Sequence, residues 1–478
     1  MNTSRLERAW SSRQYIQDQS ANPGKREWSI NRFIRKFLLG HLFVGLAALM
    51  AALLSGNAQA VPAFARQTGQ NCLACHAGGN FPELTPYGRL FKLTGYTIGK
   101  RTIPLAVMGV FGSTNVKGPS PTGPGHTATD GSLTFDTGSL FVAGKITDKS
   151  GVFAQFTYNN YSGDTGASGH VGSDNTDFRY ADQLINGDQN FIYGFDMNNN
   201  PGVEDVWNST PAWGYNVVPI STGFGSAVAL PIIDQGLAQQ AIGTGAYLYW
   251  NKTVYAELSG YRTGDGVFSF MTQGNGQQIN IKGENPYLRL ALTHDWGAQN
   301  VMLGYSYFDV DEYVPGMQNL TNHYRDNTID FQYQYLLDPH TFTVDVTRTN
   351  ESIDYGDAGS SPDSINSLMA KATYTYEAKY GAALEYFNIS NSSNNIGNTN
   401  PNFNPNAIAG EFGAQQGTEG WTPEIFWLPV QNVRIGVQYT MFNRVDGVAS
   451  GVPLADSISG SGKASGNNQV VFYVWGAY

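Results

Sequence analysis

Beyond residue 100, apolar and polar side chains alternate along short segments that show no helical period. These segments are rich in Tyr, Phe, Val and Thr, and examples are 139–146, 151–158, 246–249 with 253–261, 287–293 and 328–335. A period of two places successive side chains on opposite faces of a β-strand. About 16 such segments occur, so the pattern predicts an all-β fold of about 16 strands, the first of them at 103–113.

The connections between these segments alternate in length. Short ones fall at 148–151, 186–188, 251–252, 297–300, 337–340, 378–380 and 429–432. Long polar ones fall at 115–131, 161–175, 199–239, 264–284, 312–326, 350–364, 390–418 and 445–467. Short turns at one end and long loops at the other are typical of antiparallel outer-membrane β-barrels, whose closure leaves no strand edge unpaired in lipid. A soluble all-β protein is the alternative.

The C-terminal segment and the aromatic residues also favour a membrane barrel. In the last segment, one face carries Val470, Phe472, Val474, Gly476 and the terminal Tyr478. Aromatic residues at strand ends suit the two membrane interfaces, and the candidates are Tyr247, Tyr249, Trp250, Trp296 and Trp427. An even number of strands would place both ends of the barrel in the periplasm.

The N-terminus predicts export. Arg32, Arg35 and Lys36 precede an apolar run at 37–54, and the small-x-small pattern at 58–60 follows it. This order indicates a signal peptide over 1–60, with a long lead-in, and cleavage before Val61. A retained membrane anchor is the alternative, because 18 apolar residues can just span a bilayer. The remaining chain divides into a short segment at 61–102 and the barrel at 103–478.

Composition agrees with this division. Charged residues make up only 14% of the chain, and aromatic residues 13%. Without the eight basic and three acidic residues of 1–60, the chain keeps 20 basic and 35 acidic residues. An acidic chain of this kind is not expected to bind nucleic acid, whereas cations and outer-membrane lipid are plausible partners.

The chain's only two cysteines lie in the run Asn71-Cys72-Leu73-Ala74-Cys75-His76. C-x-x-C-H is the attachment signature of haem c: two thiols bond covalently to one edge of the porphyrin, and the histidine ligates the iron. A strained disulfide, half a zinc site and a thioredoxin-type pair are the alternatives. The motif therefore predicts one covalent haem c on Cys72, Cys75 and His76.

The sixth ligand of such a haem is less apparent. Between 61 and 107 there is no methionine and no second histidine. Met108, in the first expected strand, is the nearest soft ligand, and His126, Lys92 or an open site are the alternatives. Forty residues cannot enclose a haem alone, so the barrel lumen is expected to complete its pocket.

The residues around the motif resemble a known family. The stretches at 61–69 (VPAFARQTG), 81–89 (FPELTPYGR) and 91–96 (FKLTGY) are similar to those of the fused cytochrome–porins, the outer-membrane monohaem cytochromes of iron-oxidising bacteria. The resemblance covers about 40 residues, and the barrel is similar only in architecture and length. It implies a haem plugged into a barrel, Fe(II) as the external electron donor, and a soluble periplasmic carrier, a cytochrome or a copper protein, as the acceptor.

Several roles within the segment follow from residue chemistry. Apolar residues can cover the porphyrin faces, namely Phe64, Phe81, Leu84, Tyr87 and Phe91. Arg66, Arg89 and Lys92 can pair with the haem propionates. Acidic groups at the loop starts can hold Fe(II) as hard oxygen ligands, and the two candidate groups are Asp309, Asp311 and Glu312, and Glu351, Asp354 and Asp357.

Two alternative functions belong to other classes. The chain can be a solute porin with a regulatory haem plug, or a conduit for another donor, such as an electrode, a sulfur species or a quinol. A peroxidase is disfavoured, because the segment offers no distal histidine.

Overall fold

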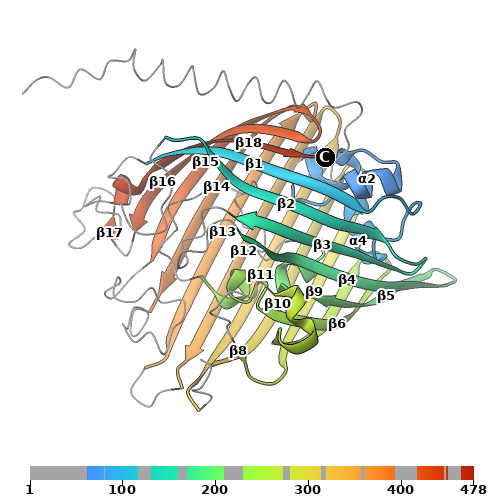
Figure 1. Ribbon diagram of the computed structural model, residues 1–478, viewed down its shortest axis with the longest axis horizontal. Helices are drawn as coiled ribbons and strands as arrows, with labels where there is room; N and C mark the ends of the chain where they lie inside the picture. The colour runs from blue at the N-terminus through green and yellow to red at the C-terminus, as the bar shows by residue number, and fades with distance from the viewer. Residues whose placement is uncertain are drawn as a thin grey trace, which may run out of the picture. The chain divides into compact units, whose positions relative to one another are not determined.

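The computed structural model describes residues 62–79, 81–116, 131–159, 170–208, 230–272, 280–313, 319–356, 361–392, 417–445, 448–449 and 464–478. The strands of this part of the chain form one antiparallel sheet (Figure 1). In chain order they are β1 (Leu105–Val116), β2 (Thr134–Lys145), β3 (Ser150–Asn159), β4 (His170–Asn186), β5 (Gln189–Asn198), β6 (Ala241–Trp250), β7 (Val254–Thr263), β8 (Asn280–Ile281), β9 (Asn285–Trp296), β10 (Gln299–Tyr313), β11 (Thr321–Leu337), β12 (His340–Asp354), β13 (Asp363–Tyr376), β14 (Tyr380–Asn391), β15 (Thr418–Val430), β16 (Val433–Val445), β17 (Val448–Ala449) and β18 (Gln469–Ala477).

The sheet closes on itself because β1 is paired along both edges. Leu105 lies opposite Val142 of β2, and Met108 lies opposite Ala477 of β18. Every other long strand pairs with its neighbours in the chain, with β7 joined to β9 and β16 joined to β18. The two-residue strands β8 and β17 are additions beside these. Sixteen long strands of the described chain therefore form a closed barrel, which confirms the predicted architecture.

Connection lengths follow the prediction at one end of the barrel. Each of the seven expected short turns joins two consecutive strands, as at Gly187 and Asp188 between β4 and β5. At the other end the strands run further than expected: β11 begins at Thr321, inside the stretch expected to be a loop. Polar residues such as Asn322 continue the alternation there, because the buried face of this barrel accepts polar side chains.

Alternation decides which side chains face the lumen. Along β10 every second residue from Asn300 to Glu312 is buried, and the residues between them are more exposed. Buried strand positions include charged and amide groups such as Arg289, Asp330 and Gln332. Outward positions carry large apolar residues that are more than half exposed, including Phe195, Leu258, Leu292, Leu303, Ile329 and Ile425. This distribution is the reverse of that in a soluble protein.

The outward face also bears an aromatic border. Trp250, Trp296 and Trp427 are 40%, 41% and 45% exposed, and each lies near a short turn. Tyr247 and Tyr249 were expected beside them, but this expectation is wrong. They lie on the opposite face of β6, where Tyr247 is 3% exposed and donates a hydrogen bond to the carbonyl oxygen of Leu93.

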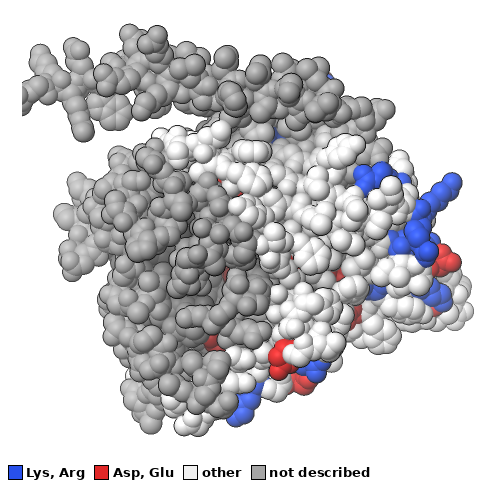
Figure 2. All heavy atoms as spheres, viewed as in Figure 1, with Lys and Arg blue, Asp and Glu red and all other residues white. Residues whose placement is uncertain are grey.

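The predicted face of the last strand is confirmed. In β18 the odd-numbered residues are buried, from Val471 to Ala477, so the even-numbered residues point outward. Figure 2 shows the visible strand surface largely free of charged side chains, which gather at its margins.

Residues 62–104 form a compact segment at the end of the barrel that carries the short turns and the C-terminus (Figure 1). It contains α2 (Pro62–Thr68), α3 (Cys72–Cys75), the 3-10 turn η1 (Ala77–Gly79) and α4 (Pro86–Leu93). α4 begins after Thr85, whose hydroxyl accepts a hydrogen bond from Gly88 N at 3.1 Å, with proline at the first helical position. We call residues 62–104 the plug.

Described parts of the connection between β5 and β6 turn into the barrel. They include α5 (Pro201–Glu204) and η2 (Ile232–Gly236), and both are largely buried. Two further single turns lie in long connections, η3 (Gly266–Met271) and η4 (Ala464–Asn467). Among the described residues, no helix is both long and apolar enough to cross a bilayer. The predicted signal peptide, 1–60, lies outside the described residues.

Candidate functional site

The C-x-x-C-H motif forms the single turn α3. Asn71 caps this turn by accepting a hydrogen bond from Ala74 N at 3.2 Å. Residues three apart on a helical turn share one face, so Cys72 and Cys75 point the same way. Neither cysteine forms a disulfide. His76 follows with an extended backbone and ends the turn, its N–H donating to the carbonyl oxygen of Cys72.

The imidazole of His76 lies in an aromatic pocket. Its ring centroid is 4.1 Å from that of Phe81, which in turn lies 4.8 Å from the ring of Trp475 on β18. His76 Nδ1 is buried and has no hydrogen-bond partner among the described residues. Burial lowers the pKa of His76 to about 3, so the ring is neutral and keeps a lone pair for a metal.

The environment of the thiols argues against a redox-active dithiol. Burial, and then the neighbouring Cys72, raise the pKa of Cys75 to about 11. Thioredoxin-type pairs need the opposite, a lowered thiol pKa that favours the nucleophilic thiolate.

Met108 lies on the lumen side of β1 and is partly buried. It packs, together with Phe81, against a cluster that contains Val110, Tyr473 and Trp475. The structure therefore brings Met108 to the same aromatic layer that contacts His76, and its ligation of a haem stays a prediction.

Among the alternatives, His126 lies outside the described residues. Lys92 is engaged elsewhere, since its ammonium donates to the carbonyl oxygens of Val203 and Asp205 at 2.5 and 2.8 Å.

These residues fit a covalently held haem. Two thiols lie on one turn, a neutral imidazole with an unpartnered buried nitrogen follows, and aromatic and thioether surfaces adjoin it. Cys72 and Cys75 would hold the porphyrin edge and His76 the iron.

Polar contacts dock the plug to the barrel wall. Glu83 pairs with Lys371 of β13 at 2.8 Å and accepts a hydrogen bond from Thr343 of β12 at 2.9 Å. Both members of the ion pair are at most 7% exposed. On the other side of the plug, Tyr96 donates to Asp177 of β4 at 2.5 Å. Contacts to opposite walls fix the position of the motif inside the lumen.

Two predicted propionate partners have other roles. Arg89 donates hydrogen bonds to Gln332 and Asn300 on the wall, at 2.8 and 2.5 Å, and Lys92 binds the inward connection as described above. Arg66 donates to backbone carbonyls at the start of β1, including that of Leu105. The expectation that Arg89 and Lys92 serve propionates is therefore corrected: they anchor the plug.

Two of the predicted porphyrin-covering residues also pack elsewhere. The rings of Phe64 and Phe91 lie 4.8 Å apart and join Tyr96 and Phe153 in a cluster against β2 and β3. Of the five apolar candidates, Phe81 makes the closest described ring contact with His76.

The two predicted acidic groups do not assemble as triads. Asp309 and Asp311 both face His323, at 3.5 and 2.7 Å, on the outward face of the barrel. Glu312 belongs to the opposite, buried face.

In the second group, Glu351 is buried and accepts a hydrogen bond from Ile232 N, whereas Asp354 pairs with Arg325 at 2.6 Å. Asp357 lies outside the described residues. Neither group assembles because side chains at odd and even positions of a strand point to opposite faces.

Sequence reasoning missed the docking residues Glu83 and Lys371, and a buried acidic cluster on the opposite wall that is described below. A charged residue at an inward strand position, such as Lys371, could have indicated that the barrel wall binds an oppositely charged group in the lumen. Its partner was not predictable, since 288 residues separate the two.

The barrel is similar to several outer-membrane proteins of known structure. The outer membrane channel DcaP of Acinetobacter baumannii matches with a TM-score of 0.44 and 11% identity, over 78% of this chain and 96% of that chain. OmpT, an outer membrane protein of Vibrio cholerae, matches at 0.41 and 8%, over 79% and 99%. The anion-selective porin from Comamonas acidovorans matches at 0.41 and 13%, over 78% and 99%.

At these TM-scores the similarities carry no conclusion about the function of this chain. A scan against protein-family models found no match, and neither did a search of curated protein sequences.

Proposed function

We propose that this chain is an outer-membrane electron-transfer protein. It would oxidise extracellular Fe(II) at one covalently bound haem c and deliver electrons to a soluble periplasmic carrier, a cytochrome or a copper protein. The observation that carries the proposal is the docking of the C-x-x-C-H segment inside a closed barrel whose outward face is apolar. Such a protein is an Fe(II):cytochrome c oxidoreductase in enzymatic terms.

The placement in a Gram-negative outer membrane rests on the barrel surface. Leu258, Leu292 and Ile425 are 63%, 56% and 67% exposed at outward positions, which would be costly in water and favourable in lipid. Short turns of such barrels face the periplasm. The plug lies at the short-turn end, so its haem motif would be open to a periplasmic acceptor.

The chain's own residues would bind the haem, orient it and shield its iron ligand from water. Cys72 and Cys75 would retain the cofactor, and His76 would hold its iron with a neutral ring. Phe81 and Trp475 would keep water from that ring. A haem bound there supplies one-electron chemistry that no side chain of the segment offers.

A solute channel is the second candidate. The observation in its favour is the closed 16-strand barrel with charged and amide groups on its inner wall, an architecture that also suits a porin. In that case the plug would regulate passage, and Fe(II) would not be oxidised quickly.

Two measurements on the purified full-length protein separate these candidates. Stopped-flow absorbance after mixing the oxidised protein with Fe(II) should show rapid growth of reduced c-type bands. His76→Ala should lose this reaction while the barrel still assembles, as judged by heat-modifiable gel migration. Planar-bilayer recording should show little conductance, because the plug occupies the lumen.

Other results would redirect the proposal. Slow reduction by Fe(II), together with full reduction by dithionite, would favour another donor. Large, steady conductance would favour the porin. A wild-type Fe(II) rate in His76→Ala would refute the haem mechanism.

A further inference from the structure

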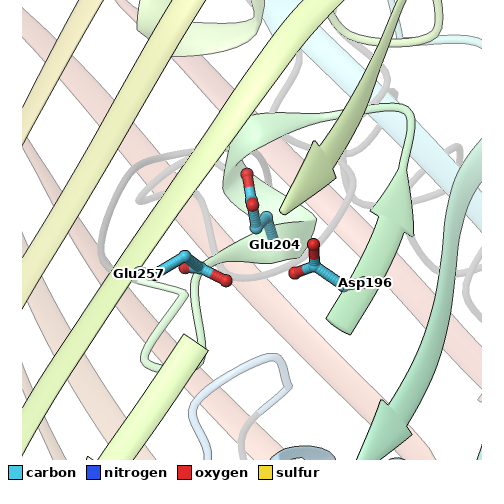
Figure 3. Close-up of side chains that lie close together, drawn as sticks. All are labelled: Asp196, Glu204 and Glu257. Atoms are coloured by element: carbon cyan, nitrogen blue, oxygen red, sulfur yellow. The ribbon is translucent and has the colours of Figure 1, made fainter. Parts of the chain in front are cut away.

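Three carboxylates meet inside the barrel on the wall opposite the ion pair of the plug. They belong to Asp196 of β5, Glu204 of α5 and Glu257 of β7, and one oxygen from each lies within 4.8 Å of the other two. Figure 3 shows the three side chains converging from three separate elements. Their exposed fractions are 6%, 0% and 1%. We call these residues the tricarboxylate cluster.

Most oxygens of the cluster have no hydrogen-bond donor. Both carboxyl oxygens of Asp196 and both of Glu257 are buried and accept no hydrogen bond from a donor group of the described residues, and the two carboxyl groups lie within hydrogen-bond reach of each other. The oxygens of Glu204, by contrast, accept from the hydroxyls of Ser259 and Tyr261. An ionised carboxylate is several kcal/mol too unstable to remain buried without compensation. A bound cation or a shared proton must therefore compensate the charge of these carboxyl groups.

The nearby cations do not balance the charge. Arg179 is committed to Asp177, with its Nε at 2.7 Å, and its Nη2 lies 3.7 Å from one oxygen of the cluster. Lys92 donates to the carbonyl oxygens of Val203 and Asp205. With all four carboxyl groups ionised, the cluster and Asp177 carry four negative charges, and Arg179 and Lys92 carry two positive charges. The excess equals the charge of one divalent ion.

We propose that Asp196, Glu204 and Glu257 form a binding site for one hard divalent cation. Carboxylate oxygens are the ligands such ions prefer, and oxygens bound at about 2.0–2.6 Å lie no more than about 5 Å apart across the ion. The oxygens of this cluster, all within 4.8 Å of one another, meet that limit. Two strands fix Asp196 and Glu257, and the hydroxyl contacts fix Glu204, so the ligands are held in place. That Fe(II) is the natural occupant rests on the function proposed above.

The site adjoins the plug. Tyr247 of β6 lies opposite Glu257 of β7 in the sheet and donates to Leu93 O at the end of α4, while Lys92 contacts the chain on both sides of Glu204. A cation held here would lie inside the lumen, beside the segment that carries the haem motif.

The test uses the full-length haem-loaded protein in detergent and Mn(II) as the probe. Loss of the electron paramagnetic resonance signal of free Mn(II) should reveal one bound ion per chain, displaced by Fe(II) under anaerobic conditions. Glu257→Gln and Asp196→Asn should each weaken Mn(II) binding at least about tenfold, because one anionic ligand is lost. Asp326→Asn is the matched control, as it changes a buried lumen carboxylate outside the cluster and keeps an acceptor for Ile233 N.

Two results would overturn the site. In the first, the wild type binds no Mn(II) and shows an infrared band of a protonated carboxyl group that Glu257→Gln removes. A proton shared between Asp196 and Glu257 would then compensate their charge. The second result is equal binding by the wild type and both cluster variants, with gel migration showing folded barrels.

Failure of the site and failure of the proposed function give different results. Mn(II) binding without rapid haem reduction by Fe(II) would refute the function and leave the cation site standing. Rapid reduction whose rate Glu257→Gln leaves unchanged at low Fe(II) would refute the assignment of Fe(II) to this site.

Discussion

At the scale of single residues, the haem motif depends on a few close contacts. His76 keeps a buried ring nitrogen without a partner, and the ring stands against Phe81, which shares an apolar cluster with Met108. Such a layer controls solvent access to a metal ligand and thereby its redox potential.

Replacing Met108 with alanine tests the sixth ligand. If Met108 ligates the iron, Met108→Ala should lower the midpoint potential by on the order of 100 mV and alter the visible spectrum, because a thioether favours the reduced iron. Met369→Ala, a methionine of a different lumen cluster, should leave both unchanged. Spectroelectrochemistry on the purified proteins measures the difference, and an unaltered Met108→Ala spectrum would exclude this ligand.

Gly88 permits the plug to be compact. A Cβ at this position would overlap the carbonyl oxygen of Cys75, so α4 can lie against α3 only because residue 88 has no side chain. Gly88→Ala should destabilise the plug by about 1–3 kcal/mol, the usual cost of overpacking. Gly109→Ala in β1 is the control, since its Cβ would meet Phe135 at an ordinary 3.6 Å.

Covalent haem incorporation per folded barrel is measured for Gly88→Ala and Gly109→Ala on haem-stained denaturing gels. Equal incorporation in the two variants would mean that the contact between α4 and α3 is unimportant.

At the scale of elements, the plug is a separate group of helices held by the wall. Its anchors differ in kind: Glu83 forms a buried ion pair, Arg89 binds neutral amides, and Lys92 binds carbonyl oxygens. Removing one partner from a buried ion pair leaves the other charge uncompensated, which is more costly than removing both.

A double-mutant cycle at the Glu83–Lys371 pair tests this docking. Lys371→Met alone should destabilise the docked plug by about 3–5 kcal/mol, because Glu83 is left buried beside Asp345. The double variant Glu83→Gln with Lys371→Met should recover much of that loss. Urea titration followed by haem absorbance gives the free energies, and purely additive single effects would contradict a coupled pair.

At the scale of the whole molecule, the barrel has a polar inside and an apolar outside. Arg289 is fully buried against Asp330, whereas Leu258 is 63% exposed. The sixteen long strands of the described chain close on themselves and leave no unpaired edge, which a bilayer requires.

The outward face therefore should not accept a charge. Leu258→Arg should destabilise the barrel in phospholipid vesicles by about 2–4 kcal/mol, the cost of arginine near the bilayer centre. Leu258→Ala should cost much less, because lipid fills the space of the lost side chain. Urea unfolding in vesicles compares the two, and equal stability of Leu258→Arg and the wild type would refute a lipid-facing position.

The strands, the turns and the haem motif could be predicted from the amino-acid sequence. Alternation is a local property, since each residue's face follows from its neighbours, and a turn needs only a few residues of the right type. C-x-x-C-H is likewise contained within five positions, at Cys72 to His76. These features were predictable because their physical causes lie within short stretches of chain.

Which side chains meet in the lumen depends on how the folded barrel closes. Asp196 and Glu257 come from β5 and β7, and their approach depends on the register between strands and on how far the connection carrying Glu204 folds inward. Alternation places Tyr247 and Trp250 on opposite faces of β6, and closure of the barrel turned the Tyr247 face toward the plug and the Trp250 face outward. Closure of the barrel brings residues hundreds of positions apart within hydrogen-bond distance, and no periodicity along the chain records which of them will meet.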